Sequence, residues 1–466
     1  MLERVCRRWQ VEETVTPPDS DLDDYRFAVD TRDNLHKTMK NIVLVVPNFR
    51  WIESNENWLW DYTPYNLCLL SATIQYIANV TILDAYNLDL SQLEFINRLK
   101  SLNPDMVGIT VLMDRYGPTG HTVARMVKAI SKEIKVIMGG VYATVNASEV
   151  IKDENIDIVV AGEGEEVLAS IVSGHIANGI WRAPRIKDLD SLPSPAYDLI
   201  DMSRYMYSVS RKNIDTPKRL PYARIMTSRG CPCACAFCQV ETISGKPFRA
   251  RSAKDVLAEI KYMKAVYGIK SILFDDDNLL HDKKRATEIF QGMVGMGLAW
   301  SSIATAVFKM DKDMIKLMKA SGCEYVDIAI ESACERILKG IIGKPVDLKH
   351  AEKMIGYLKD AGIYTSANFI IGFPTETWDE IRQTLKYAEY IDVDYVKISP
   401  LIPLKHTRLA DATTEYAKSL PILRAYEWDR INFTDSKKRK RTADRMGITE
   451  EELNVIRKKT LENITF

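Results

Sequence analysis

From Asn41 onward, short apolar runs rich in β-branched residues alternate with longer amphipathic stretches. Five of these runs predict β-strands: Ile42–Val46, Val80–Leu83, Met106–Val111, Lys135–Met138 and Ile156–Val160. The stretch Thr122–Ile130 predicts a helix, because its apolar residues recur every three to four positions. Such alternation predicts a parallel sheet covered by helices on both faces. Five strands in this order favour an α/β domain of the flavodoxin-like, doubly wound kind.

A second alternating series follows Asp188–Tyr205, a stretch of prolines and turn formers that predicts a linker. Its predicted strands are Ala223–Thr227, Ser271–Phe274, Ser301–Thr305, Tyr325–Ile330, Ser366–Ile371 and Tyr395–Ser399. Ser252 can cap the helix after the first of them, and Asp255 puts an acid into its first turn. Six strand–helix units are too few for a closed eight-stranded barrel, so they predict a partial (β/α)6 barrel.

These patterns divide the 466 residues into an N-terminal extension (1–40), a flavodoxin-like domain (41–178), a linker (179–220), a second core (221–410) and a C-terminal segment (411–466).

Lys and Arg total 63 and Asp and Glu total 63, so the formal net charge is zero. Such a chain has no global electrostatic reason to bind nucleic acid or an anionic membrane. The basic run Lys437–Arg441 predicts a solvated loop; a contact for an anionic partner is the alternative.

The chain predicts a cytoplasmic protein without an integral membrane segment. Charged residues interrupt its first positions, and its apolar runs are far shorter than a membrane span. In a reducing compartment, the 8 cysteines are not expected to form a disulfide framework. Four of them, Cys231, Cys233, Cys235 and Cys238, crowd into one segment, which indicates a metal or redox site.

Cys231, Cys235 and Cys238 have the spacing C-x3-C-x2-C directly after a predicted strand, where a barrel-type fold places its chemistry. Three thiolates suit zinc or an iron–sulfur cluster. Zinc sites commonly use two C-x2-C pairs, and the segment has no second pair. Cys233 has cysteines close on both sides, which leaves little room for all four to converge. Structural zinc and a redox dithiol of Cys235 and Cys238 remain open alternatives.

The cysteine spacing, with Phe237 just before the last cysteine, resembles the radical S-adenosylmethionine superfamily. The resemblance implies a [4Fe–4S] cluster on Cys231, Cys235 and Cys238 whose open iron binds S-adenosylmethionine. It further implies that one electron, supplied by an external reductant, cleaves the sulfonium bond and yields a 5′-deoxyadenosyl radical. In such enzymes the cofactor carries the chemistry and the protein supplies position and shielding.

Later strand ends resemble the segments with which that superfamily binds S-adenosylmethionine. Asp275 and Asp276 resemble its contact with the amino group, and carboxylates suit an ammonium. Glu331 and Ser332 resemble its ribose or carboxylate contact. The segment after the fifth strand resembles the one whose backbone contacts adenine. Its glycine allows close backbone approach, and its proline fixes the turn. The implied residues there are Ile371, Gly372 and Pro374. Ordinary turns and helix caps are the alternative interpretation of each segment.

Residues 41–178 resemble the cobalamin-binding type domain that precedes many of these enzymes. The implied cobalamin contacts are Thr110, Gly139, Gly140, Gly162, Glu163 and Gly164. Where some cobalamin proteins have D-x-H-x-x-G, residues Val46–Trp51 contain no histidine. We expect His121 to be a surface residue near a helix N-terminus, so that a bound cobalamin has no protein histidine ligand. A domain that only shapes the substrate cavity is the alternative.

Together these resemblances imply a cobalamin-dependent enzyme that functionalises an unactivated carbon, with C-methylation as the leading outcome. The expected substrate is a small molecule or biosynthetic intermediate, and the sequence identifies no residue that acts on it. One alternative is a radical S-adenosylmethionine enzyme that does without cobalamin and performs cyclisation, rearrangement or methylthiolation. A non-catalytic cofactor sensor is the alternative from another class.

Overall fold

The computed structural model describes residues 39–52, 62–182, 184–207 and 219–412. The predicted extension 1–40 lies almost wholly outside the described residues, and so do nearly all of the segment 411–466 and its basic run. The described chain divides into two units. The first extends to residue 208 and includes Ala258–Tyr267, and the second holds the remaining residues. The boundaries predicted for the extension, linker and terminal segment stay predictions.

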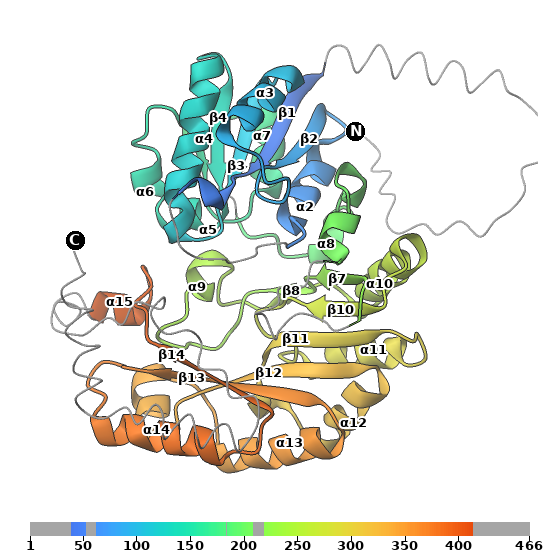
Figure 1. Cartoon of the computed structure of the whole chain (residues 1–466), viewed down its shortest axis with the longest axis vertical. Helices are drawn as coiled ribbons and strands as arrows, with labels where there is room; N and C mark the ends of the chain where they lie inside the picture. Colours follow the sequence, from blue (N-terminus) through green and yellow to red (C-terminus); the bar gives the residue numbers. More distant parts are fainter. Residues whose placement is uncertain (1–38, 53–61, 183, 208–218, 413–466) are drawn as a thin grey trace, which may run out of the picture. The chain divides into compact units, whose positions relative to one another are not determined.

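The first unit is built on one six-stranded parallel sheet with the order β2-β1-β3-β4-β5-β6 (Figure 1). Its strands are β1 (Lys40–Val46), β2 (Ala78–Asp84), β3 (Met106–Thr110), β4 (Lys135–Gly139), β5 (Ile158–Val160) and β6 (Gly179–Trp181). The first five keep the flavodoxin order, so the predicted fold class of this domain is confirmed. The sixth strand was not predicted, because three partly exposed residues give no apolar run.

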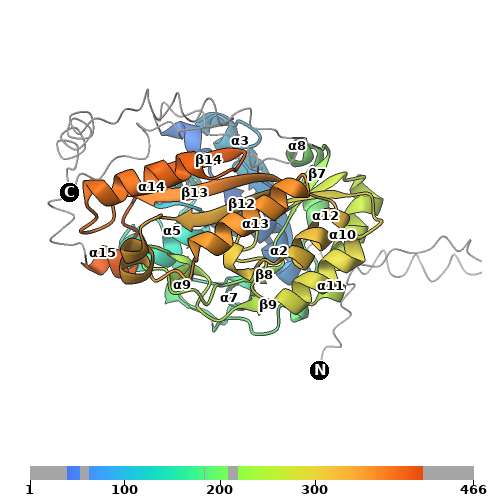
Figure 2. The ribbon, with the colours of Figure 1, turned by 90° about the horizontal axis from the view of Figure 1, so that it is seen from below.

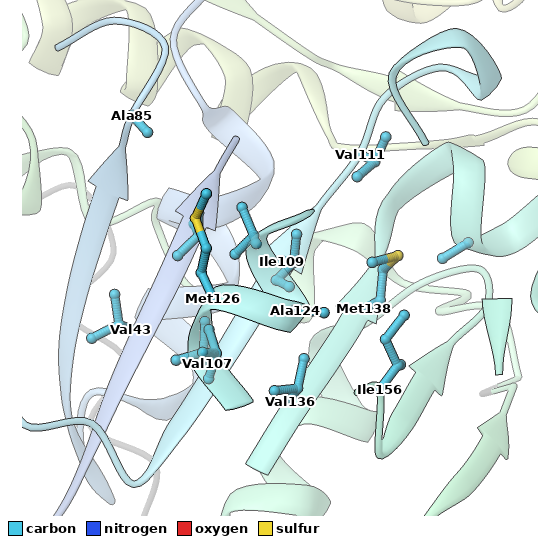
Figure 3. Packing of buried hydrophobic residues seen from close by; sticks show 14 of the residues in the cluster. Val43, Ala85, Val107, Ile109, Val111, Ala124, Met126, Val136, Met138 and Ile156 are labelled. Atoms are coloured by element: carbon cyan, nitrogen blue, oxygen red, sulfur yellow. The ribbon is translucent and has the colours of Figure 1, made fainter. Parts of the chain in front are cut away.

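The connections of this unit are α2 (Tyr65–Ile74), α3 (Gln92–Leu102), α4 (Gly117–Ile130), α5 (Gly140–Val145), α6 (Ala147–Val150), α7 (Glu165–Val172) and α8 (Ser203–Met206), with short turns η1 (Phe49–Trp51), η2 (Asp114–Tyr116), η3 (Leu189–Ser191) and η4 (Tyr197–Leu199). Helix α4 buries Val123 and Val127 completely, as the apolar period predicts. They pack with strand residues such as Val43, Val107 and Val136 in one hydrophobic core (Figure 3).

The second unit carries another six-stranded parallel sheet, with the order β14-β13-β12-β11-β10-β7 (Figure 1). Its strands are β7 (Tyr222–Ile225), β10 (Ser271–Phe274), β11 (Ala299–Thr305), β12 (Cys323–Glu331), β13 (Tyr364–Ile371) and β14 (Tyr395–Pro400). All six were predicted, and the partial barrel is confirmed. A hairpin of β8 (Ser228–Arg229) and β9 (Arg249–Ala250) is an addition that the sequence did not reveal.

The helical elements of this unit are α9 (Val240–Ile243), α10 (Ala253–Tyr267, shared with the first unit), α11 (Lys283–Met293), η5 (Val307–Lys309), α12 (Lys312–Ala320), η6 (Arg336–Ile342), α13 (Leu348–Asp360), α14 (Trp378–Tyr390) and α15 (Arg408–Ala412). Helices α11 to α14 lie along one face of the sheet (Figure 2). Ser252 caps α10 as predicted, accepting a hydrogen bond from the Asp255 amide at 3.1 Å. None of the described helices is long and apolar enough to cross a bilayer.

Candidate active site

The four clustered cysteines lie on the loop that follows the short strand β8. Gly230 opens this loop with φ +83°, and a Cβ there would lie 2.6 Å from the carbonyl oxygens of Gly245 and Pro247. No side chain fits that space, so glycine lets the two backbones approach. The amide of Cys231 then donates to the Gly245 carbonyl at 3.3 Å, which fixes the start of the loop.

The far end of the cysteine loop is held by backbone that comes much later in the sequence. The amide of Ala236 donates to the Ile342 carbonyl at 2.8 Å, and the amide of Leu409 donates to the Ala236 carbonyl at 3.1 Å. All four loop cysteines are half-buried, and all seven cysteines in the described residues are free. The four loop cysteines are therefore free of disulfides and partly accessible to solvent.

The acidic end of β10 anchors this loop. Asp276 is buried and accepts from the amide and hydroxyl of Thr227, at 3.3 and 2.7 Å, and from the Ser228 hydroxyl. Asp277 accepts from the Gly230 amide at 3.0 Å, and the Asn278 amide group points to the Cys231 sulfur at 3.6 Å. Neighbouring parallel strands end at one edge of a sheet, so this segment can hold the residues that precede the cysteines.

Asp275, the remaining acid of this strand end, is paired with a base. Arg224 of β7 donates to its carboxylate over 2.6 Å, and the two side chains are 12% and 30% exposed. Of the two residues predicted to meet the S-adenosylmethionine ammonium, Asp275 is thus the more open to solvent. The carboxylate of Asp276 is already engaged by Thr227 and Ser228. Both assignments stay predictions.

Burial and neighbouring groups set the acidities of the thiols. A hydrogen bond from Cys233 lowers the pKa of Cys231 to about 6. Burial raises the pKa of Cys235 to about 11 and also raises the pKa of Cys238. The ammonium of Lys344 acts in the opposite direction on Cys235, where it lowers the pKa. Ionising the buried thiols therefore requires nearby positive charge, which bound iron would supply.

The end of β12 carries a buried ion pair. Glu331 has φ +74°, a conformation that L side chains seldom adopt, and Lys344 donates to its carboxylate over 2.7 Å. Their side chains are only 7% and 9% exposed. Next to it, the Ser332 hydroxyl lies 3.1 Å from the Thr384 hydroxyl, so Ser332 is committed to packing against α14. Of the two predicted contacts, Glu331 and Ser332, only Glu331 has the left-handed backbone conformation.

The end of β13 presents bare backbone. Gly372 has φ +87°, and a Cβ there would meet no heavy atom within 4 Å. The amides of Gly372 and Phe373 both donate to Glu376, at 2.6 and 2.9 Å, and burial raises the pKa of Glu376 to about 7. The ring centroid of Phe373 lies 6.1 Å from that of Phe237, so an aromatic pair links this turn to the cysteine loop.

The turn after Gly372 is clamped by an arginine. The Arg336 guanidinium donates to both carboxylate oxygens of Glu380, at 2.6 and 2.7 Å, and to the Thr375 carbonyl at 2.9 Å. Glu380 also completes a capping box with Thr377 at the start of α14. Pro374 lies half-buried within this turn.

In the first unit, the carboxyl edge of the sheet is formed by glycine turns. Gly140 has φ +89°, and a Cβ there would lie 2.6 Å from the Val111 carbonyl oxygen. The Thr144 hydroxyl links the two predicted glycine loops, donating to the Gly140 carbonyl at 2.8 Å and accepting from the Gly162 amide at 2.9 Å. Gly162, with φ +91°, faces open space. Its backbone is therefore accessible to a flat ligand.

The remaining predicted cobalamin contacts at this edge differ in their hydrogen-bond partners and in the space around them. Thr110 accepts from the Asn66 side chain at 3.0 Å. Glu163 is buried and accepts from the Ile186 amide at 2.8 Å, so its carboxylate already has a structural partner. A Cβ on Gly139, which precedes α5, would lie 3.7 Å from the Val160 carbonyl oxygen, and a Cβ on Gly164 would lie 3.2 Å from the Leu70 side chain.

His121 lies near the start of α4, as expected, but it is half-buried instead of lying on the surface. Its side chain is 26% exposed and lies between Asp153 and Tyr142, with distances of 2.6 and 3.0 Å from its ring nitrogens. The sequence could not show this, because His121 comes from the connection between β3 and β4, whereas both of its partners come from the connection between β4 and β5.

Comparison with known proteins identifies the family to which the chain belongs. The Radical SAM superfamily matches residues 225–388, and the B12 binding domain matches residues 60–172. An uncharacterized methyltransferase of Pyrococcus horikoshii is 32% identical over 80% of this chain and 82% of its own length. The chain belongs to the radical S-adenosylmethionine superfamily.

A second relative and a solved structure extend this result. The cytidylyl-2-hydroxyethylphosphonate methyltransferase of Streptomyces wedmorensis is 28% identical over 67% of this chain and 68% of its own length. The radical S-adenosylmethionine methyltransferase TsrM from Kitasatospora setae, solved with cobalamin and a [4Fe–4S] cluster, has a TM-score of 0.64 at 17% identity. That match covers 81% of this chain and 78% of TsrM and shows the common fold.

For a radical S-adenosylmethionine enzyme with a B12-binding domain, the two domains imply a [4Fe–4S] cluster, S-adenosylmethionine and cobalamin. The donor set of the cysteine loop fits the cluster, because its free, reachable sulfurs are soft ligands. Among the described residues, no three His, Cys, Asp or Glu side chains are gathered around a single ion. Cluster ligands differ, because each cysteine binds its own iron.

The structure brings the predicted S-adenosylmethionine residues of the later segments to one edge of one sheet, at the ends of β10, β12 and β13, whereas Phe237, also predicted to contact S-adenosylmethionine, lies on the cysteine loop. Sequence reasoning missed three residues that organise this edge: Lys344, Glu376 and Arg336. Each acts through a partner far away along the chain or through backbone amides, and no spacing in the sequence signals such contacts. Glu376 is the partial exception, since it stands four residues after Gly372.

Proposed function

We propose that this radical S-adenosylmethionine enzyme transfers a methyl group to an unactivated carbon of a small biosynthetic intermediate. The observation that carries the proposal is that Glu331 and Gly372 lie at one edge of one sheet, that the end of β10 at this edge holds the cysteine loop, and that the chain also has a B12-binding domain. The two relatives named above are both named as methyltransferases, which supports methyl transfer over cyclisation or rearrangement.

In this proposal Cys231, Cys235 and Cys238 hold the cluster, and a low-potential, one-electron donor outside the chain reduces it. When bound, the cluster and S-adenosylmethionine supply a radical that can abstract hydrogen from carbon, and cobalamin supplies a methyl group. Glu331 would accept from ribose hydroxyls, and the backbone of Ile371 and Gly372 would meet adenine.

In the first unit, Gly140 and Gly162 would let the backbone of their loops approach cobalamin. No histidine lies in the turn after β1, so we propose that no protein histidine ligates the cobalt. The zero net charge supports a substrate other than nucleic acid. A reducing cytoplasm suits free, partly exposed cysteines.

The test is anaerobic purification with cobalamin supplied, followed by measurement of iron, sulfide and cobalt per chain. About four irons and one cobalt are expected. C235A should lose the cluster and its absorbance, whereas C233A, a control on the same loop, should keep them. Zinc in place of iron, or a C235A variant that keeps the cluster, would overturn the proposal.

Activity separates the rival functions. With reductant and S-adenosylmethionine, the enzyme should form 5′-deoxyadenosine, and with cobalamin also S-adenosylhomocysteine, because the donated methyl group leaves that product behind. Iron without cobalt, and 5′-deoxyadenosine alone, would indicate a cobalamin-independent enzyme. A cofactor sensor would form neither product.

A further inference from the structure

Lys344 is almost completely buried, which is rare for a lysine. Its side chain is 9% exposed, and its ammonium donates to Glu331 over 2.7 Å. Lysines ordinarily keep the ammonium in water, because removing it is costly unless a partner compensates. Glu331 supplies one partner, but it is itself held in a left-handed conformation at a strand end. Burying this ion pair has a desolvation cost that two apolar side chains in the same place would not have.

The segment that carries Lys344 lies against the cysteine loop. The Ile342 carbonyl accepts from the Ala236 amide at 2.8 Å. A Cβ on Gly343 would lie 3.4 Å from the carbonyl oxygen of Ala234, the residue between Cys233 and Cys235. The two residues before Lys344 thus touch the loop on both sides of Cys235. This backbone contact explains why the ammonium favours the thiolate form of that cysteine.

A positive charge at this place acts on any cluster the loop holds. A [4Fe–4S] core bound by three thiolates carries net negative charge and becomes more negative when it accepts an electron. Net charge near the sulfurs and solvent exposure are among the factors that set the reduction potential of such clusters. A buried ammonium is poorly screened, so it stabilises the reduced cluster more than the oxidised one.

We propose that the positive charge of Lys344 raises the reduction potential of the cluster. The negative charge of Glu331, its buried partner, lowers that potential and so offsets part of the effect. This inference rests on the proposed function in one respect, namely that Cys231, Cys235 and Cys238 hold the cluster. The electron comes from the low-potential donor outside the chain, and the cluster accepts it without any bond being made or broken in the protein.

The experiment is an anaerobic redox titration of the full-length, reconstituted enzyme, followed by electron paramagnetic resonance and performed without S-adenosylmethionine. K344M removes the positive charge and should shift the midpoint potential to more negative values. E331Q removes the negative charge and should shift it to more positive values. K344R keeps the charge and should stay close to wild type. K339M is the matched surface control, because Lys339 is 66% exposed and pairs only locally with Glu335.

A purely structural role would not produce shifts of opposite sign, so this pair of variants is the deciding observation. Midpoint potentials that agree between K344M and wild type, or that move in the same direction in K344M and E331Q, would overturn the inference. If K344M fails to fold or to keep iron, E331Q still tests it through the sign of its shift. A wild-type protein without about four irons would instead count against the proposed function.

Discussion

The buried Asp276 offers the sharpest test of how the cysteine loop is held. Its carboxylate accepts three hydrogen bonds, two from Thr227 and one from Ser228, just before the loop begins. Replacing it by alanine leaves these donors unpaired in the interior and opens a small cavity. Hydrogen bonds to a charged group contribute about 1.5–3 kcal/mol each, but they share one acceptor and are not additive.

For Asp276→Ala we expect the free energy of unfolding to fall by about 3–5 kcal/mol, the usual cost of breaking a buried polar network. Asp276→Asn keeps the shape and part of the hydrogen bonding, so about half that loss is expected. Because Thr227 and Ser228 lead directly into Gly230 and Cys231, the iron bound per chain should fall as well.

The assay is denaturant unfolding under anaerobic conditions, together with iron analysis. Asp379→Ala is the control, since this aspartate is 92% exposed and should change stability by less than about 0.5 kcal/mol. An Asp276→Ala protein with wild-type iron content and a stability loss below about 1 kcal/mol would refute the view that this carboxylate anchors the loop.

Two further outcomes are expected. Burial holds the pKa of Glu376 at about 7 instead of 4.5, so the folded chain binds more protons than the unfolded chain between these values, and stability should fall as the pH rises through this range. Glu376→Gln should flatten this part of a plot of melting temperature against pH; an unchanged slope would contradict the assignment. Gly162→Ala should reduce cobalamin bound per chain, whereas Gly174→Ala, with a similar positive φ (+79° against +91°) and equally open surroundings, should not. Equal retention in both variants would remove Gly162 from the cobalamin site.

Much of the fold could be predicted because it depends on periods within short stretches. Eleven of the fourteen described strands were predicted, and runs such as Ile42–Val46, apolar on both faces, are typical of parallel strands buried between helices. The strand β6 and the hairpin of β8 and β9 lack such runs, since they have only two or three residues each. Nothing local marks them.

The cysteine spacing shows the same division. Three sulfurs within eight residues are a local feature, so the sequence alone determined which kind of site to expect and on which loop. Lys344 and Glu331 are 13 positions apart, and Asp276 and Thr227 are 49 apart. Only the tertiary structure brought these partners together, because burial and ion pairing depend on how separate strands and helices pack. For the same reason it took the folded chain to show that His121 lies between Asp153 and Tyr142.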